Sequence, residues 1–167
     1  MFESLKNKIK DEFTKQPQGY WSGDKKEVKT PAHLPSAYSF NVAGINYRMD
    51  DVQKLATPIK KFTMSAKRIV EIGYANKKIY KSYYTNEPVE LRPEPTNQYD
   101  PNAIMVLING IHVGYVPQND IPYVKTFLGV PVQTFAQISG GEYRVVMGES
   151  DDKTFSEPLT IVVKLRR

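Results

Sequence analysis

Two short apolar segments joined by Asn109 and Gly110 place the strongest constraint on how this chain folds. Asn-Gly is the pair best suited to the positive φ angles of a two-residue type I′ turn. Residues 103–108 and 111–116 flank this pair and are rich in β-branched side chains, so they are expected to form a β-hairpin with a fixed register. The pairs in that register are Ile108 with Ile111, Val106 with Val113, Met105 with Gly114 and Ile104 with Tyr115.

Further strands are expected on both sides of the hairpin. Alternating apolar side chains predict a first strand over residues 38–47, with a bend at Gly44. Gly140-Gly141 and a polar loop over residues 148–156 are expected to separate the strands that follow the hairpin. The remaining expected strands are residues 89–92, 132–138, 142–147 and 158–165.

Within residues 38–167, helices are expected in three places. Helical spacing of apolar side chains and helix-capping residues predict them over residues 52–56, 65–84 and 121–128. Together with the strands, they predict an α+β domain. Its centre is expected to be a small barrel of about six mostly antiparallel strands, with two or three flanking helices.

The N-terminal part of the chain differs in pattern from the rest. Residues 2–15 place apolar side chains at helical spacing, which predicts a short amphipathic helix. Residues 16–36 mix Pro and Gly with polar residues and keep no regular period, which indicates an extended arm. We therefore expect a helix and arm over residues 1–37 and a barrel domain over residues 38–167. The barrel domain contains an added basic, tyrosine-rich segment at about residues 49–84.

Composition excludes several classes of function. The chain has no cysteine, which excludes a disulfide scaffold, a zinc site with cysteine ligands and a thiol nucleophile. Its two histidines, His33 and His112, are far apart in sequence, so no histidine-rich metal cluster is expected. The longest apolar run, residues 103–108, has six residues, whereas a membrane span needs about 20. We expect a cytoplasmic protein with no cofactor, no bound metal and no membrane contact.

The positive charge is concentrated in the middle of the chain. The net charge is +5, but residues 38–85 hold nine basic and three acidic residues, whereas residues 86–167 hold seven and ten. The middle segment also holds six of the eleven tyrosines. Cations that follow a phosphate backbone, interleaved with rings that stack on bases, are typical of single-stranded nucleic acid binding. The alternative is a solvated surface with tyrosines that face the core.

The segment over residues 91–117, LRPEPTNQYDPNAIMVLINGIHVGYVP, carries the most specific pattern. Its characteristic residues are Glu94-Pro95, Asn97, Tyr99-Asp100, Asn102-Ala103-Ile104 and Gly114-Tyr115-Val116-Pro117. This pattern resembles that of the HIRAN domain. Residues 40–44 and 138–141 are similar to the first strand and the closing region of that family, so the resemblance covers residues 38–167.

The resemblance implies an OB-like barrel that binds the 3′ end of single-stranded DNA. In such a site, two aromatic rings stack on the terminal bases and an aspartate contacts the free 3′-hydroxyl. By position in the pattern, these roles fall on Tyr47, Tyr99 and Asp100. Each stacked base contributes about 1–3 kcal/mol. A carboxylate accepts a hydrogen bond from a hydroxyl but repels a terminal phosphate, so Asp100 would select the end.

Three further residues are expected to contribute to the same site. The predicted hairpin register places Tyr115 beside Ile104, toward the end of the barrel that carries Tyr99. Arg48 and Arg92 are the candidate phosphate contacts near the pattern. Two positions differ from the family: Asn46 stands where an arginine is expected before the first tyrosine, and Gln118 where a basic residue is expected after the hairpin.

Structural roles are the alternatives for these residues. Asp100 fits a turn in which its carboxylate accepts from backbone amides, Tyr99 fits the mouth of the barrel, and Tyr47 fits a strand end. For the whole chain, we expect a non-enzymatic module that binds DNA in repair or mobile-element biology. The alternative is a protein interaction domain that uses the N-terminal helix and arm. The acidic pairs Asp50-Asp51 and Asp151-Asp152 lack a catalytic Lys or His partner at a recognisable spacing, so no catalysis is expected.

Overall fold

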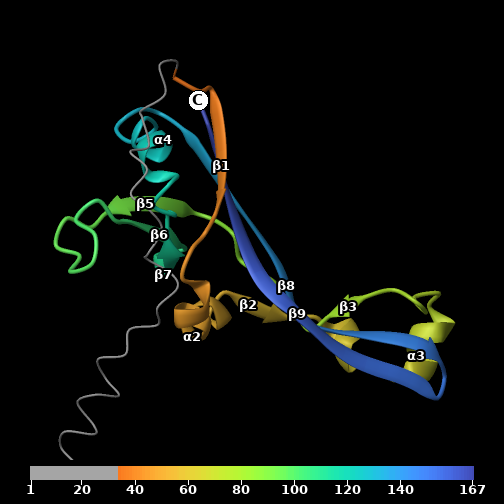
Figure 1. Cartoon of the computed structure of the whole chain (residues 1–167). Helices are drawn as coiled ribbons and strands as arrows, with labels where there is room; N and C mark the ends of the chain where they lie inside the picture. Colours follow the sequence, from red (N-terminus) through yellow and green to blue (C-terminus); the bar gives the residue numbers. More distant parts are fainter. Residues whose placement is uncertain (1–33) are drawn as a thin grey trace, which may run out of the picture.

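The computed structural model describes residues 34–167, so most of the helix and arm expected over residues 1–37 lies outside the described residues. Figure 1 shows a lobe from which a long pair of strands projects. The strands are β1 (Ala37–Asn41), β2 (Ala56–Pro58), β3 (Ile79–Tyr80), β4 (Ser82–Tyr84), β5 (Val89–Pro93), β6 (Ile104–Ile108), β7 (Ile111–Tyr115), β8 (Gln133–Gly148) and β9 (Asp151–Arg166). The α-helices are α2 (Met49–Gln53), α3 (Ala66–Glu71) and α4 (Ile121–Lys125), and the 3-10 helices are η1 (Ile45–Arg48) and η2 (Lys60–Thr63).

Within residues 34–167, hydrogen bonds join the strands into three antiparallel sheets. The largest has the order β1-β9-β8-β3, the second has the order β5-β6-β7, and β2 pairs with β4. The mixed class with mostly antiparallel sheets is therefore confirmed, but the described residues form no closed six-stranded barrel. Strands β8 and β9 run on past the lobe, where β8 pairs with β3. An isolated bridge between Ala43 and Tyr115 links the end of β1 to β7.

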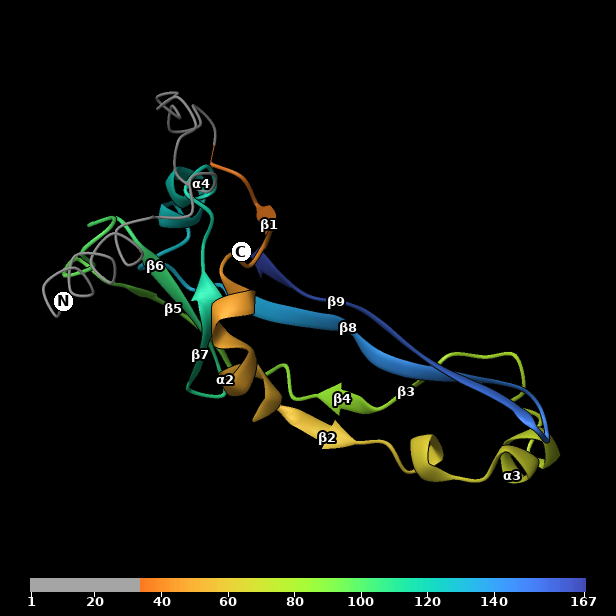
Figure 2. The same cartoon turned by 60° about the horizontal axis from the view of Figure 1, so that its bottom comes forward.

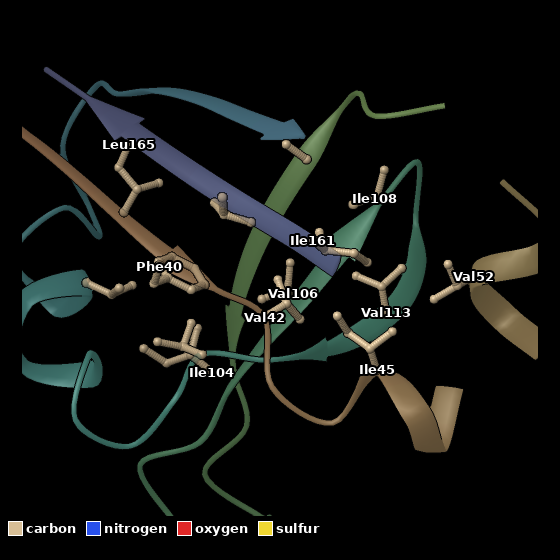
Figure 3. Packing of buried hydrophobic residues seen from close by; sticks show 14 of the residues in the cluster. Phe40, Val42, Ile45, Val52, Ile104, Val106, Ile108, Val113, Ile161 and Leu165 are labelled. Atoms are coloured by element: carbon tan, nitrogen blue, oxygen red, sulfur yellow. The ribbon is translucent and has the colours of Figure 1, made fainter. Parts of the chain in front are cut away.

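The main hydrophobic core lies between the first two sheets. Phe40 from β1, Val106 from β6 and Ile161 from β9 are buried in it, and Figure 3 shows their side chains meeting. Burying one such side chain contributes about 1.5–3 kcal/mol to folding. Ile45 of η1 and Val52 of α2 pack on the same cluster, so the core fixes the position of η1.

The projecting part of the molecule has a small core of its own. Residues 56–84 and 141–157 form this part, here termed the finger, which extends away from the lobe in Figure 2. Its centre holds Ile69 of α3, Ile79 of β3 and Val146 of β8. The buried Arg144 donates from Nη1 to the carbonyl of Phe62 at 2.6 Å, which ties β8 to η2. The basic, tyrosine-rich segment therefore supplies one layer of the finger.

The prediction of a helix over residues 65–84 is wrong beyond the first two turns. Helix α3 ends at Glu71, and Gly73, with a φ of 68°, turns the chain away from the helical path. Residues 79–84 then form β3 and β4. β-Branched and aromatic residues such as Ile79 and Tyr80 pack well on a sheet, and β8 offers them a free edge.

The C-terminal strands are longer than expected. The strands predicted over residues 132–138 and 142–147 are one strand, β8, with a bulge between Ser139 and Gly141. The polar loop predicted over residues 148–156 is also mostly strand, since β9 begins at Asp151. Polar side chains are tolerated there because the strand pair projects into solvent. The first predicted strand is shorter, since β1 ends at Asn41. The helix predicted over 52–56 is shifted to α2, and the helix predicted over 121–128 is the shorter α4.

The hairpin forms as predicted at its turn but changes register further along. Between Leu107 and Val106 the register moves by one residue, because β7 carries a bulge at Val113 that places Gly114 against the backbone of Ala43. The observed pairs are Ile108 with Ile111, Leu107 with His112, Val106 with Gly114 and Met105 with Tyr115. Tyr115 therefore lies opposite Met105 instead of the core residue Ile104.

Candidate nucleic-acid interface

A hydrogen-bond network centred on Glu94 joins β7 to the loop that precedes β6. The hydroxyl of Tyr115 donates to Oε2 of Glu94 at 3.0 Å, and Nδ2 of Asn97 donates to the same oxygen at 2.7 Å. The ring of His112 contacts the Tyr115 ring edge-on, with centroids 4.7 Å apart. Tyr115 is therefore half-buried, and its hydroxyl holds Glu94 at the start of the loop.

The loop itself is held by its own side chains. Oδ1 of Asn97 accepts from the backbone N–H of Tyr99 at 3.0 Å and of Asp100 at 3.1 Å. Oδ1 of Asp100 accepts from the N–H of Asn102 at 2.8 Å, which is the turn role considered for this carboxylate. Asn102 is anchored in turn by Lys125, whose Nζ donates to its Oδ1 at 2.7 Å. Within residues 34–167, the second carboxylate oxygen of Asp100 has no hydrogen-bond partner.

The two predicted stacking tyrosines are the most exposed of the large apolar side chains in the described part of the chain. Tyr47 is 80% exposed and Tyr99 is 82% exposed. Tyr47 lies on η1, where its N–H donates to the carbonyl of Gly44, so it does not continue a strand. The alternative in which Tyr99 packs into a barrel mouth is therefore wrong, and so is the one in which Tyr47 ends a strand. Both rings are free to contact a ligand.

Arg48 follows Tyr47 on η1 and joins the same cluster. Its Nη1 lies 3.8 Å from Oδ2 of Asp51. Burial and the nearby Arg48 lower the pKa of His112, so its ring is neutral near pH 7. Burial and the hydrogen bond to Glu94 raise the pKa of Tyr115. Arg48, Tyr115 and Glu94 thus belong to one electrostatic unit.

Arg92 lies on the same face of the β5-β6-β7 sheet as Tyr115, but outside the network around Glu94. It pairs with Met105, which pairs with Tyr115 on the next strand, so the three side chains follow one line across the sheet. Nε and Nη2 of Arg92 donate to the carboxylate of Glu90 at 2.9 and 3.0 Å. Arg92 is therefore already matched by the carboxylate of Glu90, whereas Arg48 shares the carboxylate of Asp51 with Lys54, whose Nζ lies 2.6 Å from Oδ1 of Asp51.

The two departures from the family have different surroundings. Asn46 lines a cleft of about 680 Å³ at the base of the finger, together with Met49 and Gln53. Gln118 lies in the turn before α4, where its carbonyl accepts from the N–H of Ile121 at 3.4 Å. No local pattern could indicate the cleft, because η1, α2, β4, β8 and β9 all contribute to it.

A comparison with known families shows which family the chain belongs to. A family model for the HIRAN domain matches residues 37–128, more than half of the chain. This chain belongs to the HIRAN domain family. The match contains Tyr47, Arg48, Arg92, Asp100 and every other predicted site residue, and HIRAN domains are known as DNA-binding modules. Searches of curated proteins and of solved structures found no match.

Parts of the molecule lie beyond the HIRAN match. It ends before β8 and β9, so the proposed likeness of residues 138–141 to the closing region of the family falls outside it. Among residues 34–167, no three His, Asp or Glu side chains are grouped so that they could hold a metal ion. The helices of this region are all too short or too polar to cross a bilayer.

The network around Glu94 is expected to make the stability of the loop before β6 depend on pH. The hydrogen bond from Asn97, with a second from Tyr115, holds the pKa of Glu94 below its usual value. A lowered pKa means that the carboxylate stabilises the fold above the usual glutamate pKa, and that this contribution is lost as the pH falls through the lowered value. Tyr115→Phe removes one donor and is expected to move the pKa of Glu94 back toward its usual value.

An NMR titration of the Glu94 side-chain carboxyl measures this effect. Tyr83→Phe is the matched control, because Tyr83 has no hydrogen bond to Glu94 and its substitution is expected to leave the titration unchanged. An unchanged Glu94 titration in Tyr115→Phe would show that the Tyr115 hydroxyl does not hold this carboxylate.

Proposed function

We propose that this HIRAN domain binds single-stranded DNA and recognises its 3′-hydroxyl end. The observation that carries the proposal is the exposure of two tyrosine rings, Tyr47 and Tyr99, on two segments that both contact Tyr115. The segment of Tyr47 reaches Tyr115 through the backbone hydrogen bonds of Ala43, and the loop of Tyr99 reaches it through Glu94. A large ring that is about four-fifths exposed contributes little to folding. Its placement on an ordered loop or helix favours a role in stacking on a base.

Asp100 supports recognition of the end. Its Oδ1 is used in the turn to Asn102, while in the described part of the chain its Oδ2 accepts no hydrogen bond. A 3′-hydroxyl can donate to such an oxygen, whereas a 3′-phosphate would place two negative groups together. The structural and the recognition roles of Asp100 are therefore compatible.

Stacking is proposed to supply most of the affinity. Arg92 is paired with Glu90 and Arg48 shares Asp51 with Lys54, so fewer counterions would be released when DNA binds than from unpaired arginines. A shallow dependence of affinity on salt is expected for such a site. We further propose that the domain acts without catalysis, in the cytoplasm, in DNA repair or in a mobile-element context.

The test compares oligonucleotides that end in a 3′-hydroxyl or a 3′-phosphate. Asp100→Asn is the informative variant, because an amide oxygen can still accept from the N–H of Asn102 while the negative charge is removed. The wild type is expected to prefer the 3′-hydroxyl by roughly tenfold or more, the size of one charged hydrogen bond. Asp100→Asn is expected to lose this preference and to keep its thermal stability.

Two results would contradict the proposal. Equal binding of both ends by the wild type would exclude end recognition through Asp100. Weak binding of every oligonucleotide, unchanged in Tyr99→Ala, would exclude the stacking site altogether.

A protein interaction domain is the second candidate function. The pairing of Arg92 with Glu90, and the position of Asp51 between Arg48 and Lys54, favour it, since a surface of mixed charges suits a protein partner better than a polyanion. Capture of a protein from nuclease-treated lysate, lost in Tyr47→Ala and Tyr99→Ala, would support this candidate.

A further inference from the structure

The outer layer of the finger carries a group of lysines. Residues 60–77, here termed the cap, comprise η2, α3 and the turn that follows α3. The cap covers the small core of the finger, since Phe62, Val70 and Tyr74 pack against the buried Ile69 and Val146. Figures 1 and 2 both show α3 at the end of the finger that is far from the lobe. The cap is therefore separate from the candidate interface, which lies on the lobe.

Most of the lysines of the cap are not neutralised by a neighbouring acid. In the described part of the chain, four of them have no carboxylate within 4.0 Å, and they are Lys60, Lys61, Lys67 and Lys77. The carboxylates of the finger pair with other cations instead, except that of Glu149. These pairs are Glu71 with Arg68, Glu142 with Lys81, Asp151 with Lys153, Asp152 with Arg144 and Glu157 with Lys78. The cap therefore keeps a positive charge that is available to a ligand.

Two of these lysines are held together by one ring. Nζ of Lys61 lies 4.0 Å from the centroid of the Tyr74 ring, and Nζ of Lys77 lies 5.0 Å from the same centroid. The two ammonium groups are therefore no more than about 9 Å apart, so they repel each other. The turn that carries Lys77 is fixed to β8, because the N–H of Asn76 donates to the carbonyl of Val146 at 2.8 Å. A bound anion would relieve the repulsion between the two lysines.

Phosphate groups, and not bases, are the ligands that suit this surface. The two rings of the cap, Phe62 and Tyr74, are half-buried against the small core, so neither is free to stack on a base. Ammonium groups contact phosphate oxygens without reading the base sequence. A DNA duplex carries one negative charge per about 1.7 Å of helix axis, and its bases are stacked inside. The chemistry of the cap therefore fits the outside of a duplex better than a single strand.

We propose that the cap binds the phosphate backbone of duplex DNA, as a second binding surface of this HIRAN domain. Membership of the family favours DNA over other polyanions, because HIRAN domains are DNA-binding modules. The inference goes beyond the proposed function and does not depend on it, since Tyr47, Tyr99 and Asp100 all lie outside the cap. Binding through the cap is independent of base sequence and weakens steeply with salt, in contrast to binding at the stacking site.

The experiment measures binding of a covalently closed dumbbell duplex, which has no 3′ end, to the full chain. The double variant Lys61→Gln, Lys77→Gln is expected to lose roughly tenfold or more of the wild-type affinity at about 0.1 M salt. The slope of log affinity against log salt is expected to become shallower by about 2, because two phosphate contacts are removed. Lys153→Gln, Lys164→Gln is the matched control, because it removes the same charge from two exposed lysines of β9 outside the cap. The control is expected to keep the wild-type slope.

A footprint of the lysines keeps the test independent of any variant. Acetylation of the wild-type side chains by a soluble reagent is followed by mass spectrometry, with and without the dumbbell duplex. The duplex is expected to slow acetylation at Lys61 and Lys77 and to leave the rate at Lys153 unchanged. Equal rates at the cap lysines with and without a saturating amount of the dumbbell would overturn the inference.

The outcomes separate this inference from the proposed function. Tyr47→Ala, Tyr99→Ala is expected to keep the wild-type affinity for the dumbbell, and this result supports the cap whether or not the 3′-end site exists. Dumbbell binding that is unchanged in Lys61→Gln, Lys77→Gln overturns the inference and leaves the 3′-end site intact. Two further results would overturn it. They are binding of a single strand with a 3′-phosphate as tightly as the dumbbell through the same lysines, and tighter binding of anionic phospholipid vesicles than of the dumbbell.

Discussion

Replacing both Tyr47 and Tyr99 with alanine is expected to reduce the affinity for single-stranded DNA by about 30-fold or more. Two independent stacks at about 1–3 kcal/mol each would contribute about 2–6 kcal/mol to binding. Since both side chains are at least 80% exposed, little packing is lost with them. The melting temperature of the double variant is therefore expected to match that of the wild type, and the loss is measured by fluorescence anisotropy.

Tyr83→Ala provides the matched control for this loss. Tyr83 is 58% exposed on β4, but the neighbouring Ser82 and Tyr84 line the cleft, so Tyr83 points to the other side of its strand. Its removal is expected to leave DNA binding unchanged. The salt dependence of the double variant is expected to match the wild type, because no phosphate contact is removed. Binding that survives the double substitution would contradict the stacking site.

Sequence patterns predicted the parts of the fold that local chemistry decides. The Asn109-Gly110 turn forms because its two residues adopt positive φ angles of 50° and 75°. Further from the turn, the register depends on contacts that are distant in sequence. Gly114 meets the backbone of Ala43, and no pattern within the hairpin contains that information.

The finger was not predicted for a similar reason. Ile69 and Ile79 satisfy helical spacing, but Ile79 pairs with Arg144, a partner 65 positions further along the chain. Short segments with both helical spacing and β-branched residues are decided by the tertiary partner that is present. The polar residues of β9 read as a loop because the pattern does not reveal that a strand pair projects into solvent.

The residues of the candidate site stay a prediction from the family pattern, and their electrostatic partners were not part of it. The family pattern located Tyr99 and Asp100, and the structure places both on an ordered loop. The ion pairs of the arginines were not anticipated. The spacing of Arg48 and Asp51 on consecutive helical turns, three residues apart, was the signal that could have indicated the first of them.

Gly114→Ala is expected to lower the free energy of unfolding by about 2–4 kcal/mol, through overpacking and the loss of backbone hydrogen bonds. A Cβ at this position would lie 2.3 Å from the carbonyl oxygen of Ala43 and 2.6 Å from Cγ1 of Val42. The nearest neighbour is backbone, so it cannot turn aside as a flexible side chain would. Relief of the contact requires β7 to move away from Ala43. That movement breaks the two hydrogen bonds between Ala43 and Tyr115, at 2.8 and 2.9 Å.

The same movement is expected to weaken the interface, since Tyr115 also holds Glu94. Gly129→Ala separates the steric effect from backbone strain. Gly129 has a φ of 78° with nothing within 4 Å of an added Cβ, so only a strain cost of about 1–2 kcal/mol is expected there. Urea unfolding of the two variants measures the difference. If Gly114→Ala is no less stable than Gly129→Ala, the close contact with Ala43 does not constrain the fold. If it is less stable, the bulge in β7 is the feature that joins the hairpin to the strand leading into Tyr47.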